Sequence, residues 1–326
     1  QPPNESTWVL ERNPYSIWVD TAGNQLPYID QIVMTLAEDA EILNLRAIAG
    51  EYDLQERHMR MSNLPVLLEN QEKGGYYVSL DPGPNNEFAI TFNLTYEGDA
   101  EIAKWMNTTD FRRALSLGTN RDQINEAYWL GTGTIWNILP PSDNKYYPGG
   151  DWGTKWTEYD PAKANQMLDA LGLDKKDSEG FRLRTDGNGR LTFEILAMAN
   201  QLVPYVEGCE MVREQWKAIG IDLKVSSIER SLALSRAAAN DAQLGVWVAD
   251  GNDDPFLFPF NVLPVLTHPS MSQGTLIGLW YETNGEKGVE PEPALKEVLD
   301  MLRKGPGVTE EERVKLGQEM YKQMAD

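Results

Sequence analysis

Three aspartates stand close together in the turn ADGNDDP: Asp250, Asp253 and Asp254. A carboxylate that is partly removed from water forms a strong charge-assisted hydrogen bond with an ammonium group, so such a cluster can select a cationic ligand. Two carboxylates with separated pKa values can also act as a general acid and a general base. Aspartate is equally common in solvated turns. The residue types alone leave a binding role and a plain turn open.

The elements that position these aspartates are predicted from residues 191–254. Apolar, strand-forming runs cover residues 191–200, 221–228 and 244–250, and helical patterns cover residues 204–219 and 231–240. Gly220 is expected to end the first helix, and Ser231 to cap the second. Such an alternation forms a parallel sheet with right-handed crossovers, and ligands bind at the carboxyl ends of its strands. Asp250 therefore follows a strand at the edge where a ligand is expected.

A second group of candidates lies in the Gly- and Pro-rich segment 131–153. Irregular segments of this length within a compact domain are usually functional or mobile. Its aromatic residues Trp136, Tyr146, Tyr147 and Trp152 can line a ligand cleft, or they can hold the loop in place by packing. The glycines do not form a phosphate-binding loop, because no Lys–Ser/Thr pair follows in the required frame.

Other kinds of chemistry find few suitable residues. The two histidines, His58 and His268, are far apart in the sequence, and Cys209 is the only cysteine. A His/Cys metal cluster and a Ser–His–acid triad are therefore not expected, and Cys209 fits a small core residue. The segment 174–189 lacks the ligand spacing of a calcium loop, and residues 180–195 predict a β-hairpin that turns at residues 186–189. No metal or cofactor is predicted.

Composition limits the partners and the number of domains. The chain has 326 residues, a net charge of −21 and a pI of about 4.5. Nucleic acid and anionic membrane surfaces would repel such a chain, and its length is typical of two domains. No run is apolar enough to span a membrane, and the polar start QPPNESTWVL does not read as a signal segment. Residues 31–37, 40–49 and 51–54 predict a further strand–helix–strand unit, in a different sheet.

Six segments, in order, resemble the family 5 extracellular solute-binding proteins of ABC importers, the dipeptide- and oligopeptide-binding group. They are ERNPYSIWVDTAGNQLPYIDQI, LRAIAGEYDL, FRRALSLGTNRDQINEAYWLGTG, YDPAKANQMLDALG, MVREQWKAIGIDLKVSS and VWVADGNDDP. Each segment is weak alone, but together they cover most of the chain in the family's order. The resemblance implies an α/β fold of the type II periplasmic-binding-protein (Venus-flytrap) kind. Two lobes of that fold close on a ligand, which is then delivered to a membrane permease.

The resemblance also implies how the chain divides. Residues 1–91 and 249–326 are expected to be partial segments of the larger lobe, and residues 92–248 the nearly complete smaller α/β lobe. The family's chain is expected to continue beyond both ends of this sequence. The protein is expected outside the cytoplasm, in the periplasm or on the cell surface, as a monomer that works with an ABC permease complex.

A binding role for the acidic turn follows from the resemblance. In peptide-binding members, an acidic residue just past the last strand of the smaller lobe pairs with the ligand's α-ammonium group. Asp250 matches that position best, with Asp253 and Asp254 as alternatives. The Trp-rich front segment is similar to members that bind oligosaccharides by stacking sugar rings on tryptophan. The candidates for stacking are Trp136, Trp152, Trp247 and Trp280, each of which also fits a core or surface aromatic.

Three functions are thus weighed. The leading one is a non-enzymatic receptor that captures an oligopeptide, and the second is a receptor of the same family that captures an oligosaccharide. The third is a glycosidase using two of the clustered carboxylates. The third is disfavoured because the three aspartates share one short loop and no nucleophile signature accompanies them.

Overall fold

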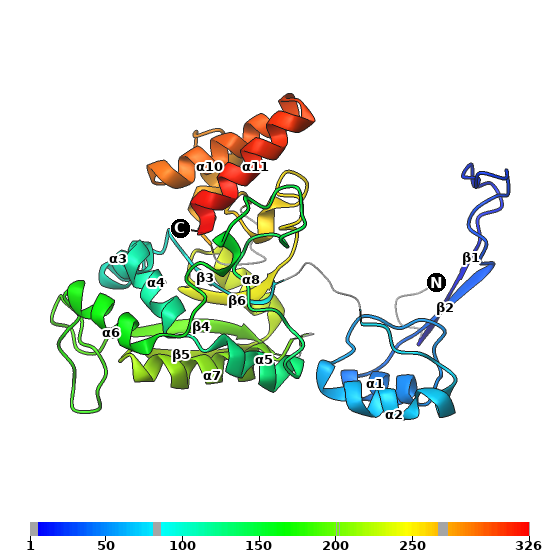
Figure 1. The fold of residues 1–326 in the computed structure, drawn as a ribbon, viewed down its shortest axis with the longest axis horizontal. Helices are drawn as coiled ribbons and strands as arrows, with labels where there is room; N and C mark the ends of the chain where they lie inside the picture. The colour runs from blue at the N-terminus through cyan, green and yellow to red at the C-terminus, as the bar shows by residue number, and fades with distance from the viewer. Residues whose placement is uncertain (1–5, 81–85, 200, 202, 267–272, 326) are drawn as a thin grey trace. The chain divides into compact units, whose positions relative to one another are not determined.

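The computed structural model of the chain describes residues 6–80, 86–199, 201, 203–266 and 273–325. The chain forms two compact units, residues 1–80 and residues 81–326, which are described separately (Figure 1). Both contain strands and helices, so the predicted α/β class is confirmed. The lobe boundaries expected after residues 91 and 248 remain predictions.

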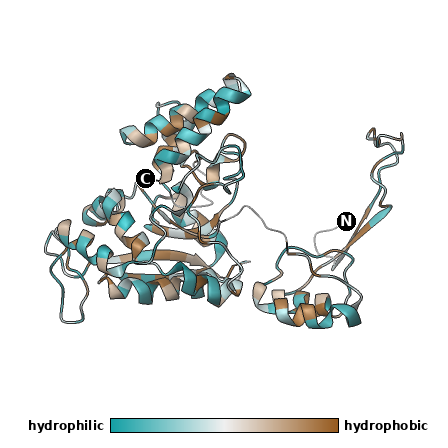
Figure 2. Ribbon diagram, in the orientation of Figure 1, coloured by the Kyte–Doolittle hydropathy of each residue, from teal (hydrophilic) through white to brown (hydrophobic). Residues whose placement is uncertain are grey.

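The first unit combines a two-stranded antiparallel sheet with two α-helices. β1 (Thr7–Glu11) pairs with β2 (Gln31–Thr35), followed by α1 (Ala40–Ile48), the 3-10 helix η1 (Met61–Asn63) and α2 (Leu64–Gly74). Residues 51–54 do not form the strand that was predicted there. The strand that pairs with β2 is β1, which comes before β2 in the chain. Gly50 has a φ of +76°, and the Glu51 amide donates to the Arg46 carbonyl, so the backbone there ends α1. The apolar side chains of β1 and β2 are exposed. Figure 2 colours the ribbon by hydropathy, with hydrophobic residues in brown.

A four-stranded mixed sheet in the order β3–β6–β4–β5 organises the second unit. Its strands are β3 (Asn86–Phe92), β4 (Thr192–Met198), β5 (Asp222–Ile228) and β6 (Leu244–Ala249). β4 runs parallel to both β5 and β6, which confirms the prediction, and β3 pairs antiparallel with β6. The carboxyl ends of three strands and the amino end of β3 therefore lie along one edge of the sheet, here called the carboxyl edge.

Helices connect and cover these strands. α7 (Tyr205–Ala218) joins β4 to β5, and α8 (Arg230–Ala238) joins β5 to β6. In Figure 1, α7 lies along the sheet on the side away from α10 and α11. The remaining helices are α3 (Ala100–Asn107), α4 (Thr109–Leu117), α5 (Arg121–Trp129), α6 (Pro161–Ala170), α9 (Thr275–Glu282), α10 (Pro293–Lys304) and α11 (Glu310–Ala325), with 3-10 helices η2 (Trp152–Thr154), η3 (Pro259–Asn261) and η4 (Gly305–Gly307).

The main core of this unit lies between the sheet and its neighbouring helices. The Phe111 and Phe193 rings, on α4 and β4, have centroids 5.4 Å apart, and both side chains are fully buried. The indole of Trp216 on α7 donates to the Thr119 hydroxyl at 2.9 Å, so its polar atom is satisfied. Cys209 is buried in the same core, where burial raises the pKa of its thiol. The core role predicted for Cys209 is confirmed.

Helix ends follow the predicted chemistry with one shift. Gly220 has a φ of +80° just past α7, as expected of a residue that ends a helix in the left-handed region. The cap predicted for Ser231 is wrong, because the N-cap of α8 is Glu229, two residues earlier. The Glu229 carboxylate instead accepts from the Ser231 amide at 2.8 Å and the Leu232 amide at 3.3 Å.

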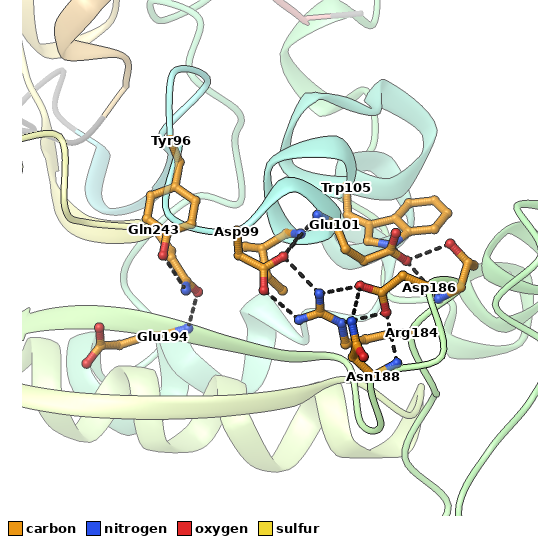
Figure 3. A network of polar contacts seen from close by, with 11 residues as sticks. Tyr96, Asp99, Glu101, Trp105, Arg184, Asp186, Asn188, Glu194 and Gln243 are labelled. Atoms are coloured by element: carbon orange, nitrogen blue, oxygen red, sulfur yellow. Dashed lines mark hydrogen bonds and ion pairs between the residues drawn. The ribbon is translucent and has the colours of Figure 1, made fainter.

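A polar network holds the turn near residues 184–190 against the start of α3 (Figure 3). The Arg184 guanidinium contacts Asp99 at 2.7 Å and Asp186 at 2.6 Å. Glu101 accepts at one oxygen from the Trp105 indole at 2.8 Å and from the Thr185 amide at 2.8 Å. The two arms pair antiparallel through the bridge between Leu183 and Arg190. The Arg184 amide donates to the Gly189 carbonyl and the Leu191 amide to the Arg182 carbonyl, both at 2.8 Å, so the predicted hairpin is present as a short one.

Candidate ligand site at the carboxyl edge of the sheet

Asp250 and Glu87 meet at the carboxyl edge because β3 and β6 run antiparallel. Asn86 pairs with Ala249, the last residue of β6, and the register shifts before Ala89 pairs with Trp247. The residue after Asn86 and the residue after Ala249 are thereby brought to the same corner of the sheet. The two helices that follow β4 and β5 also begin at this edge, with Tyr205 and Arg230 as their first residues.

Asp250 is half-buried, and its carboxylate accepts a hydrogen bond from the side-chain amide of Asn261. Burial, and then the negative charge of Asp250, raise the pKa of the Glu87 carboxyl above its ordinary range. Within the described residues, no lysine, arginine or histidine lies within ion-pair distance of either carboxylate. A cationic group placed beside the two would therefore relieve both desolvation and mutual repulsion.

Three aromatic side chains pack together near these carboxylates. The Tyr205 and Trp247 rings have centroids 5.5 Å apart, and Phe88 lies 6.1 Å from Tyr205. The Arg230 guanidinium carbon lies 4.8 Å from the centroid of the Trp247 ring. Burial, and then the negative charge of Glu87, raise the pKa of the Tyr205 hydroxyl, while Arg230 acts in the opposite direction. The edge thus combines carboxylates, aromatic faces and one guanidinium.

Asp253 and Asp254 have other surroundings than Asp250. The Asp254 carboxylate accepts from the Phe256 amide at 3.0 Å, which is the contact of a turn residue. Asp253 is exposed, and its backbone carbonyl accepts from the Asn144 side chain at 2.9 Å. Both negative charges add to burial in raising the pKa of Tyr321 on α11. The structure therefore brings Asp250 together with Glu87, and not with the other two aspartates.

Of the predicted tryptophans, Trp247 lies at the carboxyl edge. Trp136 and Trp152 are packed in a cluster with the buried residues Leu139, Tyr146, Tyr147, Tyr321 and Ala325. The Trp136 indole donates to the Pro140 carbonyl at 3.1 Å, and the Lys155 ammonium lies 4.3 Å from the Trp152 ring centroid. In this structure the two side chains hold the loop by packing. Trp280 packs against a separate core, with the Arg303 guanidinium 5.4 Å from its centroid.

Metal chemistry gains no support from the described part of the chain, which contains no group of three or more His, Cys, Asp or Glu side chains placed to hold an ion. The acidic side chains near the predicted turn are engaged elsewhere: Asp177 contacts Arg190 at 2.8 Å, and Asp186 contacts Arg184. His268 lies outside the described residues. Across the described residues, no helix has both the length and the apolar character needed to cross a membrane.

Sequence reasoning found two residues of this corner, Asp250 and Trp247, and missed Glu87, Tyr205 and Arg230. A signal existed for the latter two, because they open the helices that follow predicted strands. Glu87 had none, since nothing local indicates that β3 pairs antiparallel with β6. The arrangement of two neighbouring carboxylates can bind a ligand that carries a cation.

Comparison with known proteins decides the family. The model of the bacterial extracellular solute-binding proteins, family 5, middle region, matches residues 2–270. The chain belongs to this family. Family 5 consists of substrate-binding proteins rather than enzymes, and its members act outside the cytoplasm.

Relatives within the family differ in the ligands that their names record. The di/tripeptide-binding protein 3 of Pseudomonas aeruginosa (strain UCBPP-PA14) is 28% identical over 279 residues, which are 83% of this chain and 45% of that protein. The periplasmic alpha-galactoside-binding protein of Rhizobium meliloti (strain 1021) is 26% identical over 319 residues, 91% of this chain and 43% of that protein. The chain spans less than half the length of these curated relatives.

Solved structures agree on the fold. The oligopeptide-binding protein OppA is 31% identical, with a TM-score of 0.71 over 100% of this chain and 53% of that chain. The periplasmic binding protein MelB from Agrobacterium fabrum C58, in complex with stachyose, has a TM-score of 0.69 at 18% identity, over 98% of this chain and 48% of that chain. The predicted type II periplasmic-binding-protein fold is confirmed.

Proposed function

We propose that this chain is part of the substrate-binding component of an ABC importer, which captures an oligopeptide between two lobes and delivers it to a membrane permease. The observation that carries the peptide assignment is the half-buried Asp250 carboxylate, which lies beside Glu87 without a cationic partner among the described residues. A peptide's α-ammonium group is a cation of the right size to pair with it. The protein acts outside the cytoplasm, as a monomer.

The tryptophans support a peptide over an oligosaccharide. Stacking a sugar needs an open indole face. Trp247 has the Tyr205 ring and the Arg230 guanidinium near it, and Trp152 has the Lys155 ammonium. Trp136 packs closely on Gly153, where an added Cβ would lie 1.9 Å from the indole. Each of these three rings therefore already has a protein group against it.

An oligosaccharide ligand is the second candidate. It is favoured by the relative named for alpha-galactoside binding and by the fold shared with MelB in its stachyose complex. A neutral sugar would leave the Asp250 and Glu87 charges without a counter-ion, so it would depend on hydrogen bonds from its hydroxyl groups to these carboxylates. The two ligand classes therefore differ in how strongly binding depends on the charge of Asp250.

The deciding experiment is calorimetric titration of the full-length protein with tri- and tetrapeptides and with alpha-galactosides. Asp250→Asn keeps the size of the side chain but removes its charge, so peptide affinity should fall about tenfold to a hundredfold. Asp253→Asn is the matched control, because it makes the same change of net charge at an exposed neighbour, and it should leave affinity within about twofold.

Three results would overturn the proposal. One is equal peptide affinity for the parent protein and Asp250→Asn. A second is binding of galactosides with no binding of peptides, which would establish the second candidate. The third is conversion of either ligand into products during incubation, which would indicate an enzyme; the proposal predicts a rise in melting temperature without turnover.

A further inference from the structure

Arg230 has an unusual environment for an arginine of this acidic chain, which carries 50 Asp and Glu against 29 Lys and Arg. Among the arginines in the described part of residues 81–326, it alone makes neither an ion pair nor a side-chain hydrogen bond. Arg236, six residues along the same helix, contacts Glu194 at 2.8 Å and Asp241 at 3.0 Å. The five donors of the Arg230 guanidinium therefore have no protein acceptor there.

The place of this free guanidinium links it to the proposed ligand site. Arg230 opens α8 directly after β5, and its guanidinium carbon lies 4.8 Å from the ring centroid of Trp247, three residues before Asp250. The indole face restricts the guanidinium in orientation while leaving its N–H groups at the rim of the ring free to donate. The side chain is exposed, so its N–H groups can donate to a planar acceptor such as a ligand carboxylate.

Charged groups of both signs lie near the Tyr205–Trp247 pair. The negative charges of Glu87 and Asp250 and the positive charge of Arg230 all act on the Tyr205 hydroxyl, with opposite effects on its pKa. Yet Arg230 forms no ion pair with either carboxylate. A neutral sugar matches this separation poorly, whereas a ligand that carries both charges on one short backbone matches it well.

We infer that Arg230 is a specificity-determining residue that selects ligands carrying a carboxylate a short distance from their ammonium group. The inference rests on the proposed function, because the ammonium group is placed by Asp250. The carboxylate has two possible sources, the side chain of an acidic residue near the amino terminus of a longer peptide and the terminal carboxylate of a dipeptide. Guanidinium binds both in the same bidentate way.

Matched peptide pairs separate the two sources in calorimetric titrations of the full-length protein. One pair is Ala-Glu-Ala-Ala amide against Ala-Gln-Ala-Ala amide, which differ only in the side-chain charge. The other is Ala-Ala against Ala-Ala amide, which differ only in the terminal charge. In at least one pair, the acid should bind about tenfold more tightly than its neutral partner, as expected of a charge-assisted hydrogen bond.

Arg230→Gln should abolish that preference while leaving affinity for the neutral partner within about twofold, and Arg230→Lys should retain part of it. Lys224→Gln is the control: it removes one positive charge near the other end of β5, where the side chain is 70% exposed, and it should keep the full preference. An unchanged melting temperature for Arg230→Gln verifies that the fold is intact.

The possible outcomes separate this inference from the proposed function. If peptides bind and need Asp250, but the acid–neutral ratio is the same in Arg230→Gln as in the parent, the role of Arg230 is refuted and peptide binding stands. If neither pair shows a preference in the parent protein, the inference also fails. If no peptide binds at all, both the inference and the proposed function fall.

Discussion

Glu101 offers a sharp test of the network that holds the turn near residue 185 (Figure 3). One carboxylate oxygen accepts from the Trp105 indole at 2.8 Å, the Thr185 amide at 2.8 Å and the Thr185 hydroxyl at 2.6 Å. Trp105 is only 2% exposed, so its N–H has no access to water if that oxygen is lost. Thr185 is exposed and can bond to water instead.

The magnitude follows from this difference in exposure. In Glu101→Ala the Trp105 indole loses its acceptor inside the core, and we expect a loss of about 2–3 kcal/mol in the free energy of unfolding. For a unit of this size, that corresponds to a fall in melting temperature of roughly 4–12 °C. Glu101→Gln keeps an oxygen that accepts all three hydrogen bonds and loses only the charge, so we expect about 1 kcal/mol or less.

Differential scanning calorimetry of the full-length protein measures both variants. The pKa of Glu101 supports the same view: burial acts to raise it, but the hydrogen bonds from Thr185 and Trp105 together outweigh burial and lower it. A double-mutant cycle with Trp105→Phe isolates the indole contact, since Glu101→Ala should be less destabilising when no indole N–H remains. Equal losses for the Ala and Gln variants, or no coupling in the cycle, would refute the reasoning.

Two further predictions concern pH and loop packing. A hydrogen bond from Arg184 lowers the pKa of Asp99. This pair therefore stabilises the fold above the unfolded-state pKa of about 3.9, and the stabilisation is lost as the pH falls below that value. The difference in melting temperature between the parent and Arg184→Met should narrow from pH 6 to pH 3, and a constant difference would contradict this. Gly153→Ala places a Cβ 1.9 Å from the Trp136 indole and should lower the melting temperature and speed amide exchange in the loop, whereas Gly307→Ala, with no atom within 4 Å of its Cβ, should change neither.

Much of the fold was predictable because its signals are local. The strands and helices of residues 191–250 follow from apolar periodicity, and their alternation allows little besides a parallel sheet. The Asp160 carboxylate accepts from the Lys163 amide at 2.8 Å with Pro161 as the first helical residue, and this start of α6 is readable from two adjacent letters. Asp250 was placed at the carboxyl edge for the same reason.

Pairings between distant segments were not predictable in this way. The strand expected at residues 51–54 failed because β2 takes its partner from residues 7–11, and an apolar run does not indicate which other run it will join. The acidic turn was read as one cluster. In the structure, the Asp254 carboxylate accepts from an amide of its own turn, whereas the Asp250 carboxylate accepts from Asn261 and lies near Glu87.

The sequence by itself determined the family, the parallel β–α–β core and the presence of a carboxylate at its carboxyl edge, because these depend on residue types and spacings within short stretches. Only the tertiary structure decided which groups share the site. Glu87 comes from a strand more than 150 residues before Asp250, and Tyr205 and Arg230 come from two different helices. Their meeting depends on strand order and register, which are set by packing across the whole sheet.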